Sequence, residues 1–168
     1  MSDRSEHNLG FAEVTRKVMP NGEIRIRVRL PGDISTSITY MPVWQWQEGA
    51  PVQEGHYHRG LTEVCLVVTG WMLCVSDVIQ DGYYFNIVEK GEVVTFTPFS
   101  HHLVLLGPET IIQTTMHGPA VGNPEVQDLD RWSTGEYYDK VKLTQELLAR
   151  GRKGNGNKEK HFVGFNST

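Results

Sequence analysis

Short apolar and alternating segments recur along the chain between residues 23 and 117, separated by turn signals. They follow one another at intervals of about 8–12 residues, a rhythm typical of antiparallel sandwiches and barrels. Asn21-Gly22, Pro31-Gly32-Asp33 and Asp81-Gly82 mark tight turns between them. The segments that we expect as strands are 23–30, 35–47, 64–68, 71–78, 83–88, 93–98, 102–106 and 110–117. This pattern predicts an all-β fold, an antiparallel sandwich or barrel.

The chain before this series is expected to form a hairpin from residues 11–19 and 23–30. Its second arm alternates strictly, with aliphatic residues on one face and Arg25, Arg27 and Arg29 on the other. We expect this arginine row on a solvated face or in a subunit contact. The alternative is an anion site for a phosphorylated substrate, because guanidinium groups pair well with phosphate.

The expected organisation is one domain with less ordered ends. Residues 1–10 are predicted to be a disordered tail, and residues 11–132 a barrel with the N-terminal hairpin and a C-terminal covering loop. Ser133 or Thr134 can cap a helix over 133–151 that carries apolar residues near one face. Residues 152–168 are expected to be a flexible tail. The sequence contains no internal repeat, which favours a single barrel.

Composition narrows the class of protein. With 168 residues the chain can bury one good core. A net charge of −4 and a pI near 6.0 argue against nucleic acid as a partner. No segment reaches the length of a membrane span, and the polar start lacks an apolar signal core, so we expect a cytoplasmic protein without membrane contact.

Two cysteines are present, Cys65 and Cys74. If Thr69-Gly70 is a two-residue hairpin loop, the register places the two cysteines opposite each other. A reducing cytosol favours two buried free thiols over a disulfide.

Candidate chemistry lies between Gly55 and Gly70. His56 and His58 are two apart in an extended segment, so both imidazoles project from the same side. Glu63 stands at the head of the apolar run 64–68, where a carboxylate is costly unless a cation meets it. A divalent metal held by two neutral imidazoles and this carboxylate would meet that need.

The spacing of His56, His58, Glu63 and Gly70 resembles the first motif of the cupin superfamily. Residues 91–102 resemble its second motif, with Pro98 near its end and Phe99-Ser100 in place of the motif's glycine. The resemblance implies a single-domain cupin barrel, which is a jelly roll or double-stranded β-helix, and a fourth ligand. Counting from Gly91 makes this ligand His102, which we prefer, and counting back from Gly107 makes it His101. The expected ion is Fe, Mn, Ni, Zn or Co.

The resemblance also implies a choice of reactions at such a site on a small-molecule substrate. The preferred one is isomerase, epimerase or lyase chemistry on a sugar or hydroxy-keto acid, with Tyr57, Arg59 or the spare histidine, His101, assisting catalysis. An aromatic face formed by Tyr40, Trp44 and Trp46 favours a polyol slightly, although such faces usually serve packing. The alternatives are a non-heme iron dioxygenase and a non-catalytic cupin that binds a small ligand. Cupins are frequently dimers, and a homodimer is expected.

Overall fold

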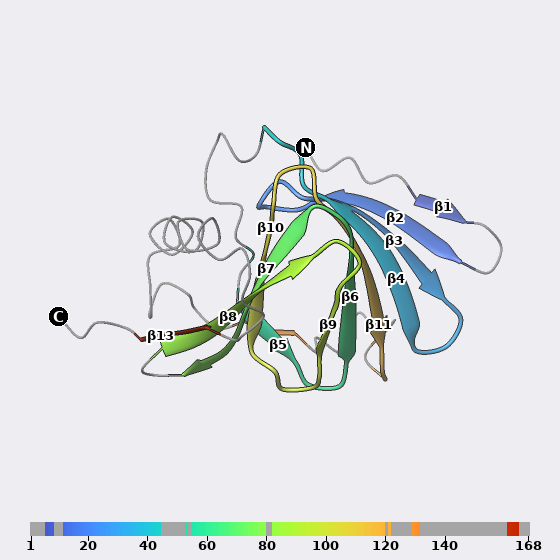
Figure 1. The fold of residues 1–168 in the computed structure, drawn as a ribbon. Helices are drawn as coiled ribbons and strands as arrows, with labels where there is room; N and C mark the ends of the chain where they lie inside the picture. Colours follow the sequence, from blue (N-terminus) through green and yellow to red (C-terminus); the bar gives the residue numbers. More distant parts are fainter. Residues whose placement is uncertain are drawn as a thin grey trace.

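Two antiparallel β-sheets face each other in the computed structural model, which describes residues 6–8, 12–44, 53, 55–79, 82–119, 121, 129–131 and 161–164 (Figure 1). The first sheet has the order β1 (Glu6–Asn8), β2 (Glu13–Val18), β3 (Ile24–Leu30), β4 (Ile34–Tyr40), β11 (Ile111–His117), β6 (Thr62–Thr69) and β9 (Val93–Phe96). The second has the order β12 (Leu129–Arg131), β5 (His56–His58), β10 (His102–Leu106), β7 (Trp71–Ile79), β8 (Gly82–Glu89) and β13 (His161–Gly164).

The chain passes repeatedly from one sheet to the other between β5 and β11. Strands β5, β7, β8 and β10 belong to the second sheet, and β6, β9 and β11 belong to the first. This alternation is typical of a jelly roll, so the predicted all-β class is confirmed. The expected helix over 133–151 lies outside the described residues. Strands β1 and β13 fall within the segments expected as tails, and they pair with β2 and β8.

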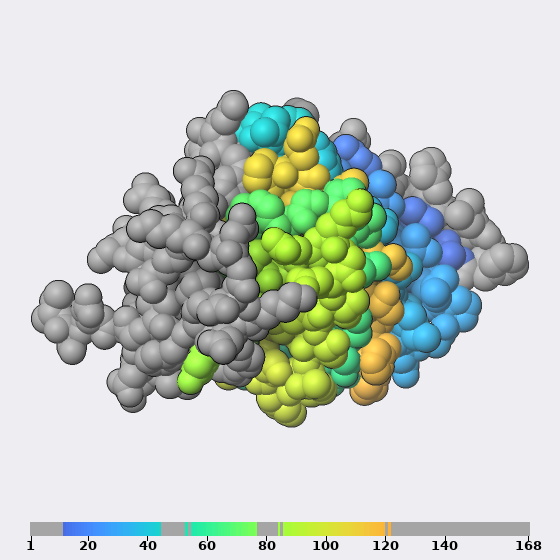
Figure 2. Space-filling model, in the orientation of Figure 1, coloured from blue at the N-terminus to red at the C-terminus, as the bar shows by residue number. Residues whose placement is uncertain are grey.

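Figure 2 shows one face of the molecule, where the yellow-green segment that includes β9 occupies the centre and the blue strands of the N-terminal hairpin lie to the right. The core lies between the sheets. Its buried residues come from both sheets and from the turn after β4: Met41, Cys65, Val67, Met72, Cys74, Val88, Phe96, Val104, Leu106 and Ile112. Burying each large aliphatic or aromatic side chain contributes about 1.5–3 kcal/mol.

The connection from β6 to β7 differs from the expected hairpin. The two strands lie in different sheets, and Cys65 pairs with Thr114 and Val94 instead of Cys74. Gly70 makes the crossing with φ of 76°, a conformation that a side chain disfavours. The predicted cross-strand register of the cysteines is therefore wrong. The prediction of free thiols is confirmed, since both are unbonded and buried, and burial raises the pKa of each.

The strand expected over 35–47 is shorter than predicted. β4 ends at Tyr40. Pro42 follows two residues later and cannot donate to a β-ladder. In this turn the backbone N–H of Met41 donates to the carbonyl of Thr110. The expected aromatic face does not form on β4 as predicted, because Trp44 lies after the end of the strand and is 49% exposed. Trp46 lies outside the described residues.

The arginine row of β3 faces the space between the sheets. Ile26 is 44% exposed and pairs with Ile38, which is 43% exposed, so the aliphatic side of these strands is the outer one. The arginines pair instead with the buried Ser35, Ser37 and Thr39 of β4. The expected solvated face is therefore wrong for Arg25 and Arg27, whereas the Arg29 side chain is 39% exposed. The exposed aliphatic face is a surface that a homodimer would bury, and the homodimer stays a prediction.

Candidate metal centre

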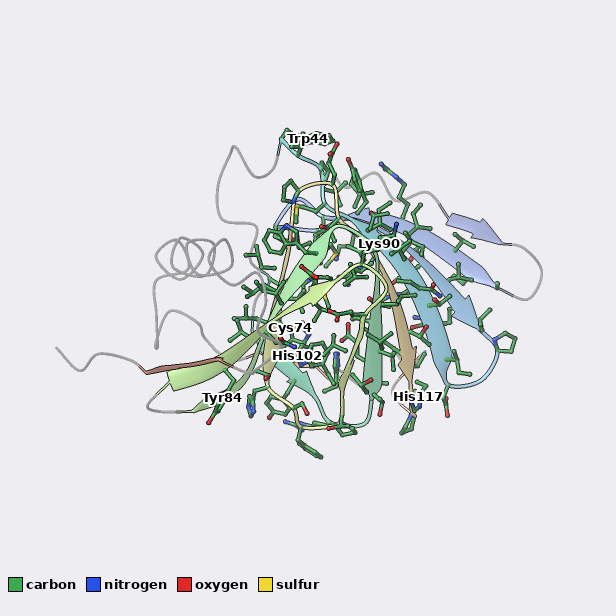
Figure 3. All side chains as sticks on the ribbon, in the orientation of Figure 1. Trp44, Cys74, Tyr84, Lys90, His102 and His117 are labelled. Carbon is green, nitrogen blue, oxygen red and sulfur yellow. The ribbon has the colours of Figure 1, made fainter. Side chains whose placement is uncertain are left out.

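Four side chains from both sheets converge at one point inside the sandwich. His56, His58, Glu63 and His102, called the His/Glu group below, each offer a ligand atom, and these atoms all lie within 4.8 Å of one another. Figure 3 labels His102 near the middle of the molecule, away from His117 at the end of β11. The set of three imidazoles and one carboxylate could hold a metal ion.

Strand register explains why these residues meet. His56 and His58 lie on the same face of β5, because Tyr57 between them projects the other way. β10 pairs with β5 through His102 and His56, which brings their imidazole centroids to 4.4 Å. The chain then turns at Arg59-Gly60 and enters β6 in the facing sheet, where Glu63 is buried.

The tautomer of His102 follows from its backbone contact. Its Nδ1 lies 2.8 Å from the carbonyl oxygen of Ser100. A carbonyl can only accept, so Nδ1 carries the proton and Nε2 of the neutral ring keeps its lone pair. Phe96 stacks on the imidazole at 3.9 Å between centroids, with an interplanar angle of 10°, which limits rotation of the ring. The ring is thus oriented in the way that metal-binding histidines usually are.

The Nε2 atom of His102 faces an acceptor. It is buried, has no hydrogen-bond partner among the residues that the structure describes, and lies 3.6 Å from Glu63 Oε2. A lone pair that faces a carboxylate oxygen in a buried site is unfavourable unless a cation lies between them. This contact is the strongest geometric indication that the His/Glu group fits a metal ion.

Glu63 is held from both sides of its carboxylate. Oε2 lies 3.3 Å from His58 Nε2, and the Cys65 thiol, whose Sγ is 3.4 Å from Oε1, donates to that oxygen. Burial is the largest influence on the pKa of Glu63 and raises it, but positive charge at His102 and His58 outweighs burial and holds the pKa well below its ordinary value. When these rings are neutral, a bound cation would supply that positive charge. The carboxyl group is therefore ionised and supplies one negative charge to the site.

The three residues expected to assist catalysis lie outside the His/Glu group. Tyr57 and His101 contact each other, with ring centroids 4.6 Å apart, and Tyr57 projects from the face of β5 opposite His56 and His58. His101 and Arg59 are exposed. The structure brings His102 into the group and leaves His101 out. Catalytic roles for Tyr57, Arg59 and His101 stay predictions.

The turn between β9 and β10 keeps the shape that the motif's glycine would allow. Phe99 has φ of 65°, in the left-handed region that bulky residues rarely adopt. Its backbone N–H donates to the carbonyl oxygen of His58 at 2.6 Å, which ties the turn to β5. Such strain costs about 1–3 kcal/mol and is common near functional sites.

One buried carboxylate was missed by the sequence interpretation. Glu23 is fully buried, and both of its carboxylate oxygens accept from Gln53 Nε2 at 2.9 Å. Arg25 lies 3.4 Å from one of them. The sequence indicated its position only through alternation, which places Glu23 on the same face of the strand as Arg25, Arg27 and Arg29. A charged face in this strand looked solvent-exposed by its pattern alone.

Glu23 predicts a pH dependence of stability. Burial raises its pKa above the ordinary 4.5, although Arg25 and Gln53 act the other way and Glu63 reinforces the rise. A raised carboxyl pKa stabilises the fold at low pH, and this contribution is lost as pH rises through the folded-state value. We expect urea unfolding with a chelator present to show that wild type loses stability relative to Glu23→Gln as pH rises from 4.5. A difference that does not change with pH would contradict the assignment.

Comparisons with known proteins agree on the fold. No model of a protein family matches the chain, and no curated protein matches its sequence. The capsular polysaccharide assembling protein CapF from Staphylococcus aureus is similar in structure, with a TM-score of 0.53 and 20% identity over 69% of this chain and 31% of that one. Salicylate 1,2-dioxygenase from Pseudoaminobacter salicylatoxidans has a TM-score of 0.52 and 13% identity over 70% of this chain and 30% of that one. This chain therefore aligns with about a third of each of those two chains.

An RmlC-like cupin from Shewanella frigidimarina is also similar, with a TM-score of 0.47 and 15% identity over 72% of this chain and 88% of that one. The alternating sheets and the two matches with TM-scores above 0.5 show that the chain shares its β-sandwich fold with domains of these larger proteins. The fold and the convergence of these four residues agree with the resemblance to cupins noted from the two motifs. In the part of the chain that the structure describes, no helix has the length and apolarity that a membrane crossing requires.

Proposed function

We propose that this protein is a metal-dependent cupin enzyme that acts on a small polar substrate by isomerase, epimerase or lyase chemistry. The observation that carries the proposal is the buried contact between His102 Nε2 and Glu63 Oε2, two acceptors at 3.6 Å. Three imidazoles and one carboxylate suit Fe, Mn, Co, Ni or Zn, whereas a thiolate-rich set would favour softer ions. When bound there, such an ion would supply Lewis-acid polarisation of a substrate oxygen.

The residues of this chain prepare the site in distinct ways. The Ser100 carbonyl fixes the proton of His102 on Nδ1. The lone pair of Nε2 is therefore available to bind a metal ion. The Cys65 thiol orients Glu63 through Oε1 and leaves Oε2 directed at the imidazoles. The single negative charge of Glu63 leaves part of a divalent charge to act on the substrate.

The polar interior supports a hydroxylated substrate. Ser37 and Thr39 of β4 and Thr114 of β11 are buried on the face of the first sheet that carries Glu63. These hydroxyl groups make the face polar, which suits a sugar or a hydroxy-keto acid better than an aromatic hydrocarbon. The two structural matches above 0.5 concern capsular polysaccharide assembly and salicylate dioxygenation, and their low identity does not choose between these chemistries.

The reaction class is tested with protein loaded separately with Mn, Zn, Ni and Fe. A panel of aldoses, ketoses and hydroxy-keto acids is incubated in deuterated water and followed by NMR. We expect metal-dependent exchange of a substrate C–H for deuterium, and no exchange with the His56→Ala variant. Oxygen uptake with the iron form in place of exchange would establish the dioxygenase instead. Ligand binding without turnover in any metal form would establish a non-catalytic cupin.

A further inference from the structure

We propose that Arg27 binds an anionic group of the substrate, a carboxylate or a phosphate, inside the same barrel. This inference rests on the proposed function, and it narrows the substrate to a small organic anion. The arginine row lies on β3, within the seven-stranded sheet that also contains β6 and Glu63. Three features carry the inference: the face on which Arg27 lies, the lack of an acidic partner within the described part of the chain, and the buried polar residues between Arg27 and Glu63.

Strand register places Arg27 on the inner face. Arg27 pairs with Ser37, Ser37 pairs with Thr114, and Thr114 pairs with Cys65. Directly paired residues in adjacent antiparallel strands project from the same side of a sheet. Ser37, Thr114 and Cys65 are all buried, so this side is the interior one. Glu63 is two residues from Cys65 and therefore projects from the same face of β6. Arg27 and Glu63 thus project into the same interior space.

The other two arginines of the row already have acidic partners. Arg25 lies 3.4 Å from Glu23 and donates from Nε to Thr39 Oγ1 at 3.1 Å. Arg29 lies 3.0 Å from Glu13 near the rim of the sheet. Arg27 between them has no ion pair and no side-chain hydrogen bond among the residues that the structure describes. Its five N–H donors are thus open to a ligand.

The partial burial of the Arg27 guanidinium favours an anionic ligand. Arg27 is partly buried, and burial, together with Arg25 and Arg29, lowers the pKa of its guanidinium while Glu63 opposes the change. An arginine stays protonated even so, and a partly desolvated positive charge is unfavourable without a partner. Glu63 does not fill this role, because its oxygens contact His58, His102 and Cys65. A carboxylate or phosphate would accept two parallel hydrogen bonds from the guanidinium fork.

The spacing suits one small molecule that reaches both sites. Arg29, Ser35, Met116 and Glu63 form one row across the sheet, and Arg27 lies in the next row. Three interstrand steps separate β3 from β6, which places the backbones roughly 14 Å apart. Side chains that extend inward from both strands shorten this gap. A substrate could therefore place its anionic group at Arg27 and its reacting oxygens at the His/Glu group.

The test uses zinc-loaded full-length protein with malonate and inorganic phosphate as separate probes, measured by calorimetry. We expect at least one probe to bind wild type and to lose tenfold or more in affinity with Arg27→Gln. Arg27→Lys should bind with intermediate affinity, because an ammonium keeps the charge and loses the fork. The control is Arg16→Gln, which removes the same charge from the outer face of β2, opposite Ile26, and should bind as wild type does.

The outcomes separate this inference from the proposed function. Unchanged affinity in Arg27→Gln, an equal loss in Arg16→Gln, or no binding of either probe to wild type would overturn the anion site. If Arg27→Gln does not fold, as judged by thermal unfolding, Arg27→Lys decides. The metal content of every sample is measured in parallel. If the protein is fully loaded with metal but probe binding does not depend on Arg27, only the anion site is contradicted. If probe binding depends on Arg27 but the protein takes up no metal, only the metal-dependent enzyme is contradicted. The probe that loses affinity identifies the anion as carboxylate or phosphate.

Discussion

A His102→Ala variant is expected to lose at least nine-tenths of the bound metal after dialysis against a weak chelator. His102 is 1% exposed, and its Nε2 lies 3.6 Å from Glu63 Oε2 and has no hydrogen bond to any residue in the described ranges. Alanine removes one of four ligands and leaves a buried gap in which water binds the ion less tightly than imidazole does. Loss of a supporting group alone typically costs 10–100-fold in metal affinity, so loss of a ligand should cost about 100-fold or more. Elemental analysis of the dialysed protein measures the effect.

The neighbouring histidine provides the control. His101 is exposed, contacts Tyr57, and is not part of the His/Glu group. The His101→Ala variant should keep the metal content of wild type, because its imidazole projects away from the site. Equal metal loss in both variants would contradict the geometry and return the fourth ligand to an open question.

A Gly70→Ala variant is expected to lose about 2–5 kcal/mol of folding stability. Gly70 has φ of 76°, and an alanine there pays about 1–2 kcal/mol for the left-handed conformation. Its added Cβ would also lie 2.2 Å from Thr110 Oγ1 and 2.9 Å from Thr110 Cα, so the backbone must shift. Overpacking of this kind typically costs another 1–3 kcal/mol. Urea unfolding of the metal-free protein measures the sum.

Gly91 separates the two contributions. Its φ of 85° is similar, but a Cβ added there meets nothing within 4 Å. The Gly91→Ala variant should therefore lose only the conformational part, about 1–2 kcal/mol. An equal loss in the two variants would show that the contact with Thr110 adds nothing. Native domains are stable by only about 5–15 kcal/mol, so the predicted difference is easily measured.

His56, His58 and Glu63 could be predicted as metal ligands from the sequence because the pattern that identifies them lies within one short segment. Strand alternation alone places His56 and His58 on one face, and a carboxylate at the head of an apolar strand requires a partner. The choice between His101 and His102 was different, since counting from either end of the second motif gave a different answer. It depends on which residue of β10 pairs with His56, a contact between segments more than forty residues apart. No local pattern contains that register.

The arginine row shows where periodicity fails. Alternation correctly divides β3 into an aliphatic and a basic side, but it does not say which side is inner. The usual rule places aliphatic residues inside, and here Ile26 is outside because Ser37 and Thr39 of the paired strand line a polar interior. The cysteine register failed for a related reason. A turn glycine such as Gly70 can join two sheets as well as two arms of one hairpin, and only the pairing of β6 with β11 and of β7 with β10 distinguishes these cases.

The central claim is that the His/Glu group binds one cation through three imidazoles and a carboxylate. X-ray absorption at the edge of the bound metal reports its ligands directly. We predict a shell of nitrogen and oxygen neighbours with the outer-shell scattering of about three imidazole rings, because His56, His58 and His102 offer donor atoms within 4.8 Å of one another. A shell dominated by sulfur, or one that lacks imidazole scattering, would contradict the account.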